Sequence, residues 1–198
     1  MKNILFRYHI PLLISCICLI LALLNDPVSD FLRFDRSAIA NGQLWRLITA
    51  NLLHTNFNHM LINSAGLWLI WGIFWDIGNK KTQWSFLLFP ILLNTSILYF
   101  LVPEVNYYVG LSGALHGTII AFGIADFNSN KLTSIGLIIG VSIKIAYELI
   151  MGSSEWTTSF IEADVVEEAH LWGAVSGLIT GLIYLKFFSP APNSQQAE

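Results

Sequence analysis

Charged side chains are scarce in this sequence. Of its 198 residues, 12% are Asp, Glu, Lys or Arg and 55% are hydrophobic, whereas a soluble domain usually carries roughly 25% charged residues. Half the usual charge, combined with long apolar runs, excludes an ordinary soluble domain and predicts a membrane protein. The net charge is −3 and no basic block is present, which argues against nucleic acid as a partner.

Cysteine is also nearly absent. Cys16 and Cys18 are the only two, and they lie two residues apart inside the first apolar run. That placement fits neither a disulfide framework nor a zinc site, so we expect both to be small core hydrophobes. The run ends at Asn25 without the small-x-small pattern of a signal-peptide cleavage site, so we expect a retained membrane span.

Six apolar stretches are suited to crossing the hydrocarbon layer, which takes about 20 helical residues. They are residues 8–24, 57–76, 84–102, 112–127, 132–151 and 167–188. Since nothing sizeable remains for a soluble domain, we expect one all-α, six-helix membrane domain over the whole chain, 1–198. The tail 189–198 is expected to be disordered. The one long connection, 25–56, has an amphipathic middle that is expected to pack at the membrane surface.

Lysine and arginine are distributed unevenly between the two ends of these spans. With the N-terminus inside, six lie on the cytoplasmic side: Lys2, Arg7, Lys80, Lys81, Lys131 and Lys186. Three lie on the outer side: Arg33, Arg36 and Arg46. Because cytoplasmic flanks of membrane proteins are enriched in basic residues, this bias favours both termini inside. Polar side chains then converge on the outer leaflet: His54, His59, Ser112 and His170.

The fourth span opens with VGLSGALHG, which is unusually polar for a membrane segment. A helix over residues 112–127 would be about 24 Å long, shorter than the roughly 30 Å hydrocarbon layer. We therefore expect Ser112 below the outer surface, in a wet pocket. An isolated serine at this place would be interpreted as a helix N-cap. Here Gly110 permits a tight turn, Gly113 leaves room for a neighbouring backbone, and the helix start favours negative charge.

The sixth span carries a histidine in register with three glycines. Gly173, Gly177 and Gly181 follow His170 on one helical face. Ridges of the G-x-x-x-G type let membrane helices approach closely. The fourth span offers a ridge of its own, formed by Gly113, Gly117 and Ala121. If the two ridges meet, the histidine comes down beside Ser112.

A histidine beside a serine forms a workable general base and nucleophile, since imidazole takes a hydroxyl proton near neutral pH. His170 is the first candidate for the base. His116 is the second, because it follows Ser112 by one helical turn and helical side chains lean towards the N-terminus.

Two further polar pairs have the i, i+4 spacing of helical neighbours. His59 and Asn63 share a face of the second span, where they suit either an oxyanion hole or ordinary interhelical hydrogen bonds. Lys144 and Glu148 share a face of the fifth span, near the middle of the membrane. Ionisable residues at that depth indicate either a functional role or a polar packing seam.

In combination, these residues resemble the rhomboid family of intramembrane serine proteases. The similarity covers essentially the whole chain and rests on four motifs in order: WR at Trp45-Arg46, H-x-x-x-x-H-x-x-x-N at His54, His59 and Asn63, GLSG at 110–113, and H-x-x-G-x-x-x-G at 170–177. The resemblance implies a rhomboid-like bundle in a bacterial inner membrane. It also implies membrane-anchored protein substrates, which are cleaved near the outer face without a metal or organic cofactor.

The resemblance also implies roles for individual residues. Ser112 would be the nucleophile and His170 the base, in a dyad without an aspartate. Oxyanion contacts would come from His59, Asn63 and the Ser112 backbone N–H. Residues 45–46 would belong to a structural outer loop.

One residue departs from the usual rhomboid pattern. Four residues after the serine, typical members carry an aromatic residue that stacks on the catalytic histidine, whereas this chain has His116. Together with the short six-span build and the pair Lys144 and Glu148, this resembles the rhombosortase branch. Members of that branch are thought to process proteins that end in Gly-Gly, a hydrophobic helix and a basic tail.

Two other function classes stay open. A catalytically silent rhomboid-like binding protein would share the fold, although such relatives usually lack the serine or the histidine. A haem or metal protein could draw on four histidines near one leaflet: His54, His59, His116 and His170. Against a metal site, the sequence has no paired-ligand repeat across two spans and no H-E-x-x-H motif.

Overall fold

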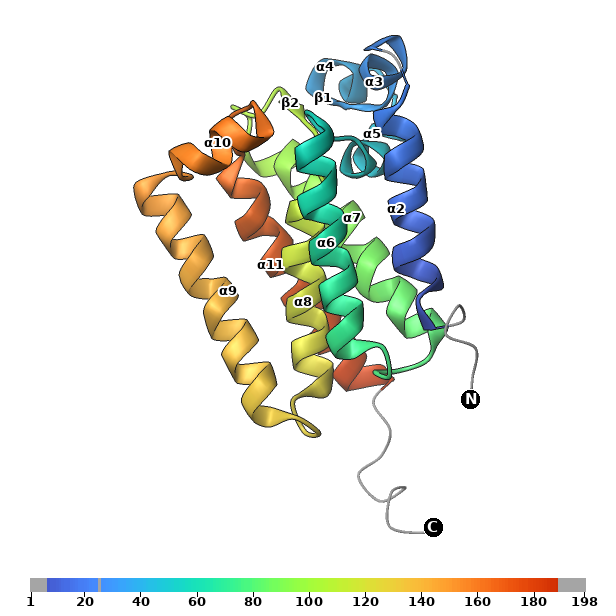
Figure 1. Cartoon of the computed structure of the whole chain (residues 1–198), viewed down its shortest axis with the longest axis vertical. Helices are drawn as coiled ribbons and strands as arrows, with labels where there is room; N and C mark the ends of the chain where they lie inside the picture. The colour runs from blue at the N-terminus through green and yellow to red at the C-terminus, as the bar shows by residue number, and fades with distance from the viewer. Residues whose placement is uncertain (1–6, 25, 189–198) are drawn as a thin grey trace.

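The computed structural model describes residues 7–24 and 26–188, and this part of the chain is mostly helical. Its long helices run side by side as a bundle (Figure 1): α2 (His9–Ala22), α6 (Phe57–Phe74), α7 (Lys80–Leu101), α8 (Ser112–Asp126), α9 (Lys131–Met151) and α11 (Glu167–Phe187). The expected all-α class is confirmed.

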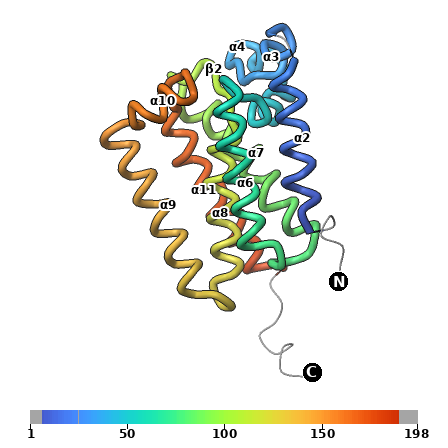
Figure 2. The backbone as a smooth tube through the Cα atoms, in the orientation of Figure 1, coloured from blue at the N-terminus to red at the C-terminus, as the bar shows by residue number. Residues whose placement is uncertain are grey.

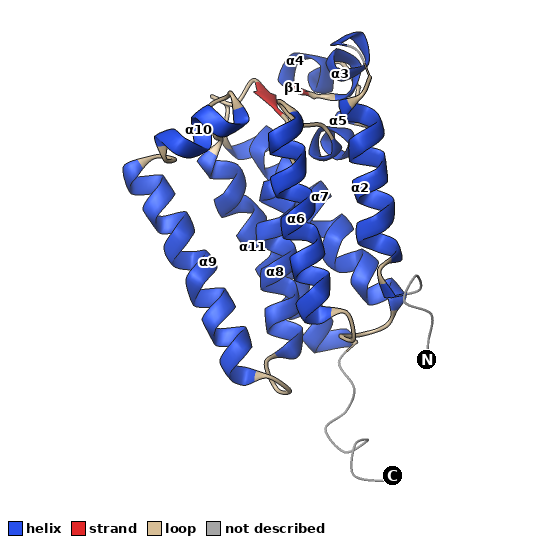
Figure 3. Ribbon diagram, viewed as in Figure 1, coloured by secondary structure: helices blue, strands red, loops and turns tan. Residues whose placement is uncertain are grey.

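Short elements gather towards one end of the bundle (Figure 3). They are α3 (Asp26–Leu32), β1 (Phe34–Asp35), α4 (Arg36–Ala40), α5 (Arg46–Thr49), the 3₁₀ helix η1 (Ala50–Leu52), β2 (Tyr107–Tyr108) and α10 (Glu155–Ile161). Strands β1 and β2 pair antiparallel, with Phe34 opposite Tyr108, and they form the one sheet among the described residues. The segment before α8 is thereby fixed to the long connection before α6.

Each of the six expected spans coincides with one long helix. The largest difference lies at α7, which begins at Lys80 rather than at residue 84. Asn79 caps this helix, because its side chain accepts a hydrogen bond from the Thr82 N–H at 3.0 Å. By length and hydropathy, α7 and α9 are the two described helices that could cross a membrane, and α2 is a shorter apolar helix. The tail 189–198 and residues 1–6 lie outside the described residues.

Helix α8 lies at the centre of the bundle and packs most extensively against α11 (Figure 2). Their backbones touch through glycine: a Cβ added to Gly173 would overlap the Gly113 carbonyl, and one added to Gly177 would overlap the Gly117 carbonyl. The expected glycine ridges therefore meet. The third pair of ridge residues differs from the expectation, because Gly181 packs against Ile124 and not against Ala121.

An aromatic cluster fixes α8 to the helices on its other side. The Phe122 ring of α8 lies 5.3 Å from the rings of Trp71 and Phe74 and 5.0 Å from that of Phe86, measured between centroids. All four rings are fully buried. Such pairs contribute about 0.5–1.5 kcal/mol each beyond the area they bury. Helices α6, α7 and α8 thus form one rigid support beneath the polar end of the bundle.

Two arginines hold the connection that precedes α6. Arg46, which is buried, donates from Nη1 to the carbonyls of Asp30 at 2.8 Å and Arg33 at 2.7 Å. Arg36 donates from Nη2 to the carbonyls of Leu98 at 2.9 Å and Val102 at 2.6 Å, at the end of α7. Carbonyls at a helix C-terminus lack intrahelical partners, so a guanidinium satisfies them well. The connection is an ordered cap on the bundle.

Helix α9 is the least embedded of the long helices. Within an apolar stretch of 18 residues, 11% of α9 is buried, against 39% of the corresponding stretch of α7. Its two buried residues are Ser134 and Ile145. It packs mainly on α8, with a smaller contact to α11, and it stands at the edge of the bundle in Figure 1.

Candidate active site

The turn before α8 places Ser112 at the first residue of that helix. Gly110 has φ +126°, a conformation that residues with a Cβ rarely adopt, and an added Cβ would lie 2.9 Å from the His59 ring. The Gly110 N–H donates to the Ala50 carbonyl at 3.1 Å, which fixes the turn. Leu111 is the N-cap residue, and no side chain caps the helix. The serine hydroxyl is therefore not used as a helix cap.

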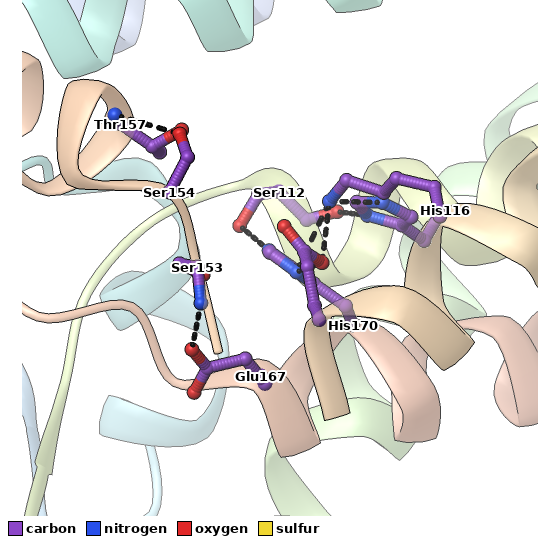
Figure 4. A network of polar contacts seen from close by, with 9 residues as sticks. Ser112, His116, Ser153, Ser154, Thr157, Glu167 and His170 are labelled. Carbon is purple, nitrogen blue, oxygen red and sulfur yellow. Dashed lines mark hydrogen bonds and ion pairs between the residues drawn. The ribbon is translucent and has the colours of Figure 1, made fainter. Parts of the chain in front are cut away.

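Ser112 and His170 point towards each other across the contact between α8 and α11 (Figure 4). Ser112 Oγ lies 3.0 Å from His170 Nε2, within hydrogen-bond range. The close approach follows from the glycine ridges, since Ala169 and Gly173 pack directly on Gly113. A side chain at Gly113 or Gly173 would push the two helices apart and separate this pair.

The other nitrogen of His170 meets the pair of ionisable residues on α9. His170 Nδ1 lies 2.8 Å from Glu148 Oε2, and the same oxygen accepts from Lys144 Nζ at 2.8 Å. The expected depth of Lys144 and Glu148 near the middle of the membrane stays a prediction. Glu148 lies one turn before α9 ends at Met151, and it contacts His170 in the first turn of α11.

His116 lies beside His170 rather than beside the serine hydroxyl. The two imidazole rings stack, with centroids 4.3 Å apart and planes at 26° (Figure 4). His116 Nδ1 lies 2.7 Å from the Ser112 carbonyl oxygen and so donates to it. Its Nε2 is then an acceptor, and it receives a hydrogen bond from Lys144 Nζ at 3.0 Å. Both ring nitrogens are engaged away from Ser112 Oγ.

His59 and Asn63 of α6 lie on the other side of the turn that precedes Ser112. The His59 ring lies against Gly110, and its Nδ1 accepts from the Thr55 N–H at 3.4 Å. Asn63 Nδ2 donates to the His59 carbonyl at 3.1 Å within α6. An amide nitrogen carries two hydrogens, so one remains for another acceptor. These two residues are close to the serine turn, and no direct contact with Ser112 is formed.

His54 lies behind His59, in the loop between η1 and α6. The two rings meet edge to face, with centroids 5.0 Å apart. Burial lowers the pKa of His54 to about 3, so its imidazole is neutral near pH 7. A neutral, buried ring at this place packs against His59 rather than supplying charge to the site.

A cavity of about 570 Å³ opens in front of the serine. Its walls include Ser112, His116, Asn63 and His170 on the bundle side, and Trp156 on the α10 side. The cavity therefore lies between the polar side chains of the bundle and the apolar side of α10, which forms its roof.

Hydrogen bonds attach this roof to the start of α6. Thr55 Oγ1 donates to the Ile161 carbonyl at 2.6 Å. The side-chain amides of Asn56 and Asn58 donate to the Phe160 carbonyl at 3.2 Å and 3.3 Å. Helix α10 thus connects the mostly exposed helix α9 to helix α6 in the bundle.

Two residues beneath the serine turn were missed in the sequence. Tyr108 is buried and its hydroxyl donates to the Gly110 carbonyl at 2.7 Å; burial raises the pKa of this phenol to about 12, so it stays neutral. The Asn94 side chain packs against Gly113 and is fully buried. The signal for Asn94 was available, because a lone amide in the apolar run 84–102 has to face protein rather than lipid.

The histidines do not form a metal centre in the described part of the chain. His116 pairs with His170 and His54 pairs with His59, each through ring contacts. Across residues 7–24 and 26–188, no group of three or more His, Cys, Asp or Glu side chains is arranged to hold a metal ion.

Comparison with known proteins gives a family. The Rhomboid domain family matches residues 41–187, from before α5 to the end of α11. A protein of Bacillus subtilis (strain 168) named "Putative rhomboid protease YdcA" is 28% identical over 150 residues, which cover 73% of this chain and 69% of that protein. The chain therefore belongs to the rhomboid family, whose members are integral membrane proteins and generally serine intramembrane proteases.

Proposed function

We propose that this protein is an intramembrane serine endopeptidase in which Ser112 is the nucleophile and His170 its general base. The observation that carries the proposal is the 3.0 Å distance between Ser112 Oγ and His170 Nε2 at the edge of a cavity. A nucleophile needs a base within hydrogen-bond reach, and the base needs a further group that orients it. The contact of His170 Nδ1 with Glu148 meets that second condition.

The reaction follows from this geometry. His170 Nε2 accepts the hydroxyl proton while Ser112 Oγ attacks the carbonyl carbon of the scissile peptide bond. The imidazolium then gives that proton to the departing amine, which leaves an acyl-enzyme. A water molecule in the cavity then attacks the ester carbonyl and passes a proton to His170 Nε2. The imidazolium returns this proton to Ser112 Oγ as the ester bond breaks, which releases the carboxylic acid and restores the serine hydroxyl.

Donors for the oxyanion lie on two sides of the serine. The N–H groups of the first helical turn have no intrahelical partner, so the Ser112 backbone N–H is free to donate. When His59 Nδ1 accepts from Thr55, its Nε2 carries the proton and faces the Gly110 turn. Asn63 has a second amide hydrogen to offer. Each oxyanion donor is worth about 10²–10³ in the rate of reaction.

The substrates we propose are membrane-anchored proteins whose chain unwinds near the outer face of a bacterial inner membrane. A cavity of about 570 Å³ accommodates a short extended segment but not a folded domain. The placement of His116 beside His170 supports membership of the rhombosortase branch. We therefore propose a C-terminal Gly-Gly tail with a hydrophobic helix as the preferred target.

Cleavage of a membrane-anchored reporter tests this function. A tagged protein that ends in Gly-Gly, a hydrophobic helix and a basic tail is produced together with wild type, Ser112→Ala or Ser142→Ala. Ser142 is the control serine, because its hydroxyl bonds to the Ile138 carbonyl on the exposed side of α9. We expect wild type and Ser142→Ala to release the tagged domain and Ser112→Ala to leave it intact.

Three other outcomes have distinct meanings. Release by Ser112→Ala at the wild-type level would reject the proposed nucleophile. Equal release from a reporter with Leu-Leu in place of Gly-Gly would reject the rhombosortase preference and leave the protease assignment standing. A wild type that binds the reporter without cleaving it would instead support the silent binding protein.

A further inference from the structure

Two side chains of α9, Glu148 and Lys144, compete for Nδ1 of the His170 ring. Nδ1 lies 2.8 Å from Glu148 Oε2 and 3.2 Å from Lys144 Nζ. The same carboxylate oxygen lies 2.8 Å from Lys144 Nζ, so it contacts the ammonium group and the imidazole at once. The side chains of His170 and Glu148 are only 7% and 11% exposed, and water therefore competes weakly for this contact.

The two competitors favour opposite tautomers of His170. A carboxylate only accepts, so the contact with Glu148 requires the proton on Nδ1 and leaves Nε2 free to accept from Ser112. An ammonium group only donates, so a hydrogen bond from Lys144 requires a bare Nδ1 and moves the proton to Nε2. In that second tautomer the serine has no base. The shorter of the two distances belongs to Glu148.

We propose that Glu148 is a positioning residue, which holds His170 in the Nδ1–H tautomer and keeps Lys144 from occupying Nδ1. This inference rests on the proposed function, in which Ser112 is the nucleophile and His170 the base. It replaces the dyad that the family resemblance implies with a triad of Ser112, His170 and Glu148. During acylation the serine proton moves to Nε2 and later to the leaving amine. Glu148 takes up no proton and faces the transient imidazolium charge.

Lys144 has two acceptors other than Nδ1, and both lie closer to its ammonium group. It donates to Glu148 Oε2 and, at 3.0 Å, to His116 Nε2, which is a bare nitrogen because Nδ1 of that ring donates to the Ser112 carbonyl. The ammonium group thereby neutralises the carboxylate charge and ties α9 to α8. Removing the carboxylate frees Lys144 to move onto His170. Loss of Glu148 is therefore expected to be worse than loss of both residues.

Phosphonylation of Ser112 by a fluorophosphonate probe measures the activity of the base without a natural substrate. In Glu148→Gln, the amide N–H can donate to Nδ1 and stabilise the wrong tautomer. We expect the labelling rate constant of the purified full-length protein to fall by about 10²–10⁴-fold, as amide substitution of the acid does in serine protease triads. The thermal midpoint should stay close to that of wild type.

Glu167→Gln is the matched control. Glu167 Oε1 accepts from the Ser153 N–H at 2.9 Å (Figure 4), and glutamine keeps an oxygen for that bond. The substitution removes the same charge close to the start of α11 without touching His170. We expect its labelling rate to stay within about twofold of wild type, as for a surface substitution away from the reacting groups.

A double variant separates positioning from packing. Lys144→Ala combined with Glu148→Ala should label faster than Glu148→Ala alone, by about tenfold, because no ammonium group then competes for Nδ1. If Glu148 served only to pack α9, the double variant would be at least as slow as the single one. A double variant that labels no faster than Glu148→Ala would therefore contradict the proposal.

The tautomer itself can be read in the unmodified sequence by nitrogen-15 NMR of histidine-labelled protein. The His170 signals are identified by their loss in His170→Asn, and we expect a protonated Nδ1 and a bare Nε2. A protonated Nε2 in the wild type would overturn the proposal, and so would a Glu148→Gln labelling rate within about twofold of wild type. Equal labelling of wild type and Ser112→Ala would instead reject the proposed nucleophile, while the NMR result would still test the contact between Glu148 and His170.

Discussion

At the scale of single residues, the proposed base and the three side chains that contact it come from three helices. Ser112 and His116 come from α8, Glu148 from α9 and His170 from α11. The His116 ring covers one face of His170, in the place where the family usually has an aromatic residue. Stacking and hydrogen bonding are therefore separate contributions of His116, and a substitution can remove one and keep the other.

His116→Phe keeps the stacked ring and removes both ring nitrogens. It loses the bonds to the Ser112 carbonyl and to Lys144, each worth about 1 kcal/mol. We expect probe labelling of Ser112 to fall by no more than about tenfold to thirtyfold, since 1.4 kcal/mol corresponds to tenfold. Loss of labelling as complete as in His170→Ala would contradict the assignment of the base to α11.

Some of these residues could be predicted from the sequence and others could not. Ser112 and His170 were found because each stands beside glycines that let two backbones touch. The contact between Glu148 and His170 was missed, because a sequence gives neither the depth nor the rotation of α9 relative to α11. Asn63 lines the cavity, while the bond it forms is to the His59 carbonyl within its own helix, so its part in an oxyanion hole stays a prediction.

At the scale of elements, the site depends on two contacts of different strength. Helices α8 and α11 meet backbone to backbone, which sets the distance between Ser112 and His170 within narrow limits. Helix α9, which carries Glu148, is mostly exposed along its length. Displacement of α9 would therefore remove the acid while leaving the serine and histidine together.

Gly173→Ala tests the backbone contact. An added methyl group would overlap the Gly113 carbonyl, and overpacking of this kind costs typically about 1–3 kcal/mol. We expect a lower thermal midpoint and a loss of probe labelling together. Gly140→Ala is the control on α9, where an added Cβ meets nothing within 4 Å; its midpoint and labelling should match wild type. A Gly173→Ala variant that is as stable as Gly140→Ala would contradict the packing described here.

At the scale of the whole molecule, the polar site lies near one end of an otherwise apolar bundle. The six long helices were predictable from the sequence, because each apolar run has the length that a helix needs. The ordered connection before α6 was not, since its fold depends on Arg36 and Arg46 reaching carbonyls far along the chain. An inside location of both termini remains a prediction from the bias of lysine and arginine.

Cysteine labelling in intact spheroplasts tests that orientation. In a background with Cys16→Ala and Cys18→Ala, one variant carries Glu104→Cys in the loop after α7 and another carries Ser129→Cys in the turn before α9. With both termini inside, a membrane-impermeant maleimide should label the first variant in intact cells and the second only after lysis. The reverse pattern would place the site on the cytoplasmic side.

The most direct test of the central claim is to identify the residue that a fluorophosphonate modifies. Purified wild type, Ser112→Ala and His170→Ala are treated with the probe, digested and analysed by mass spectrometry. The account predicts one adduct, on the peptide that contains Ser112, in wild type alone. An adduct on another residue, or a Ser112 adduct that forms as fast in His170→Ala as in wild type, would contradict it.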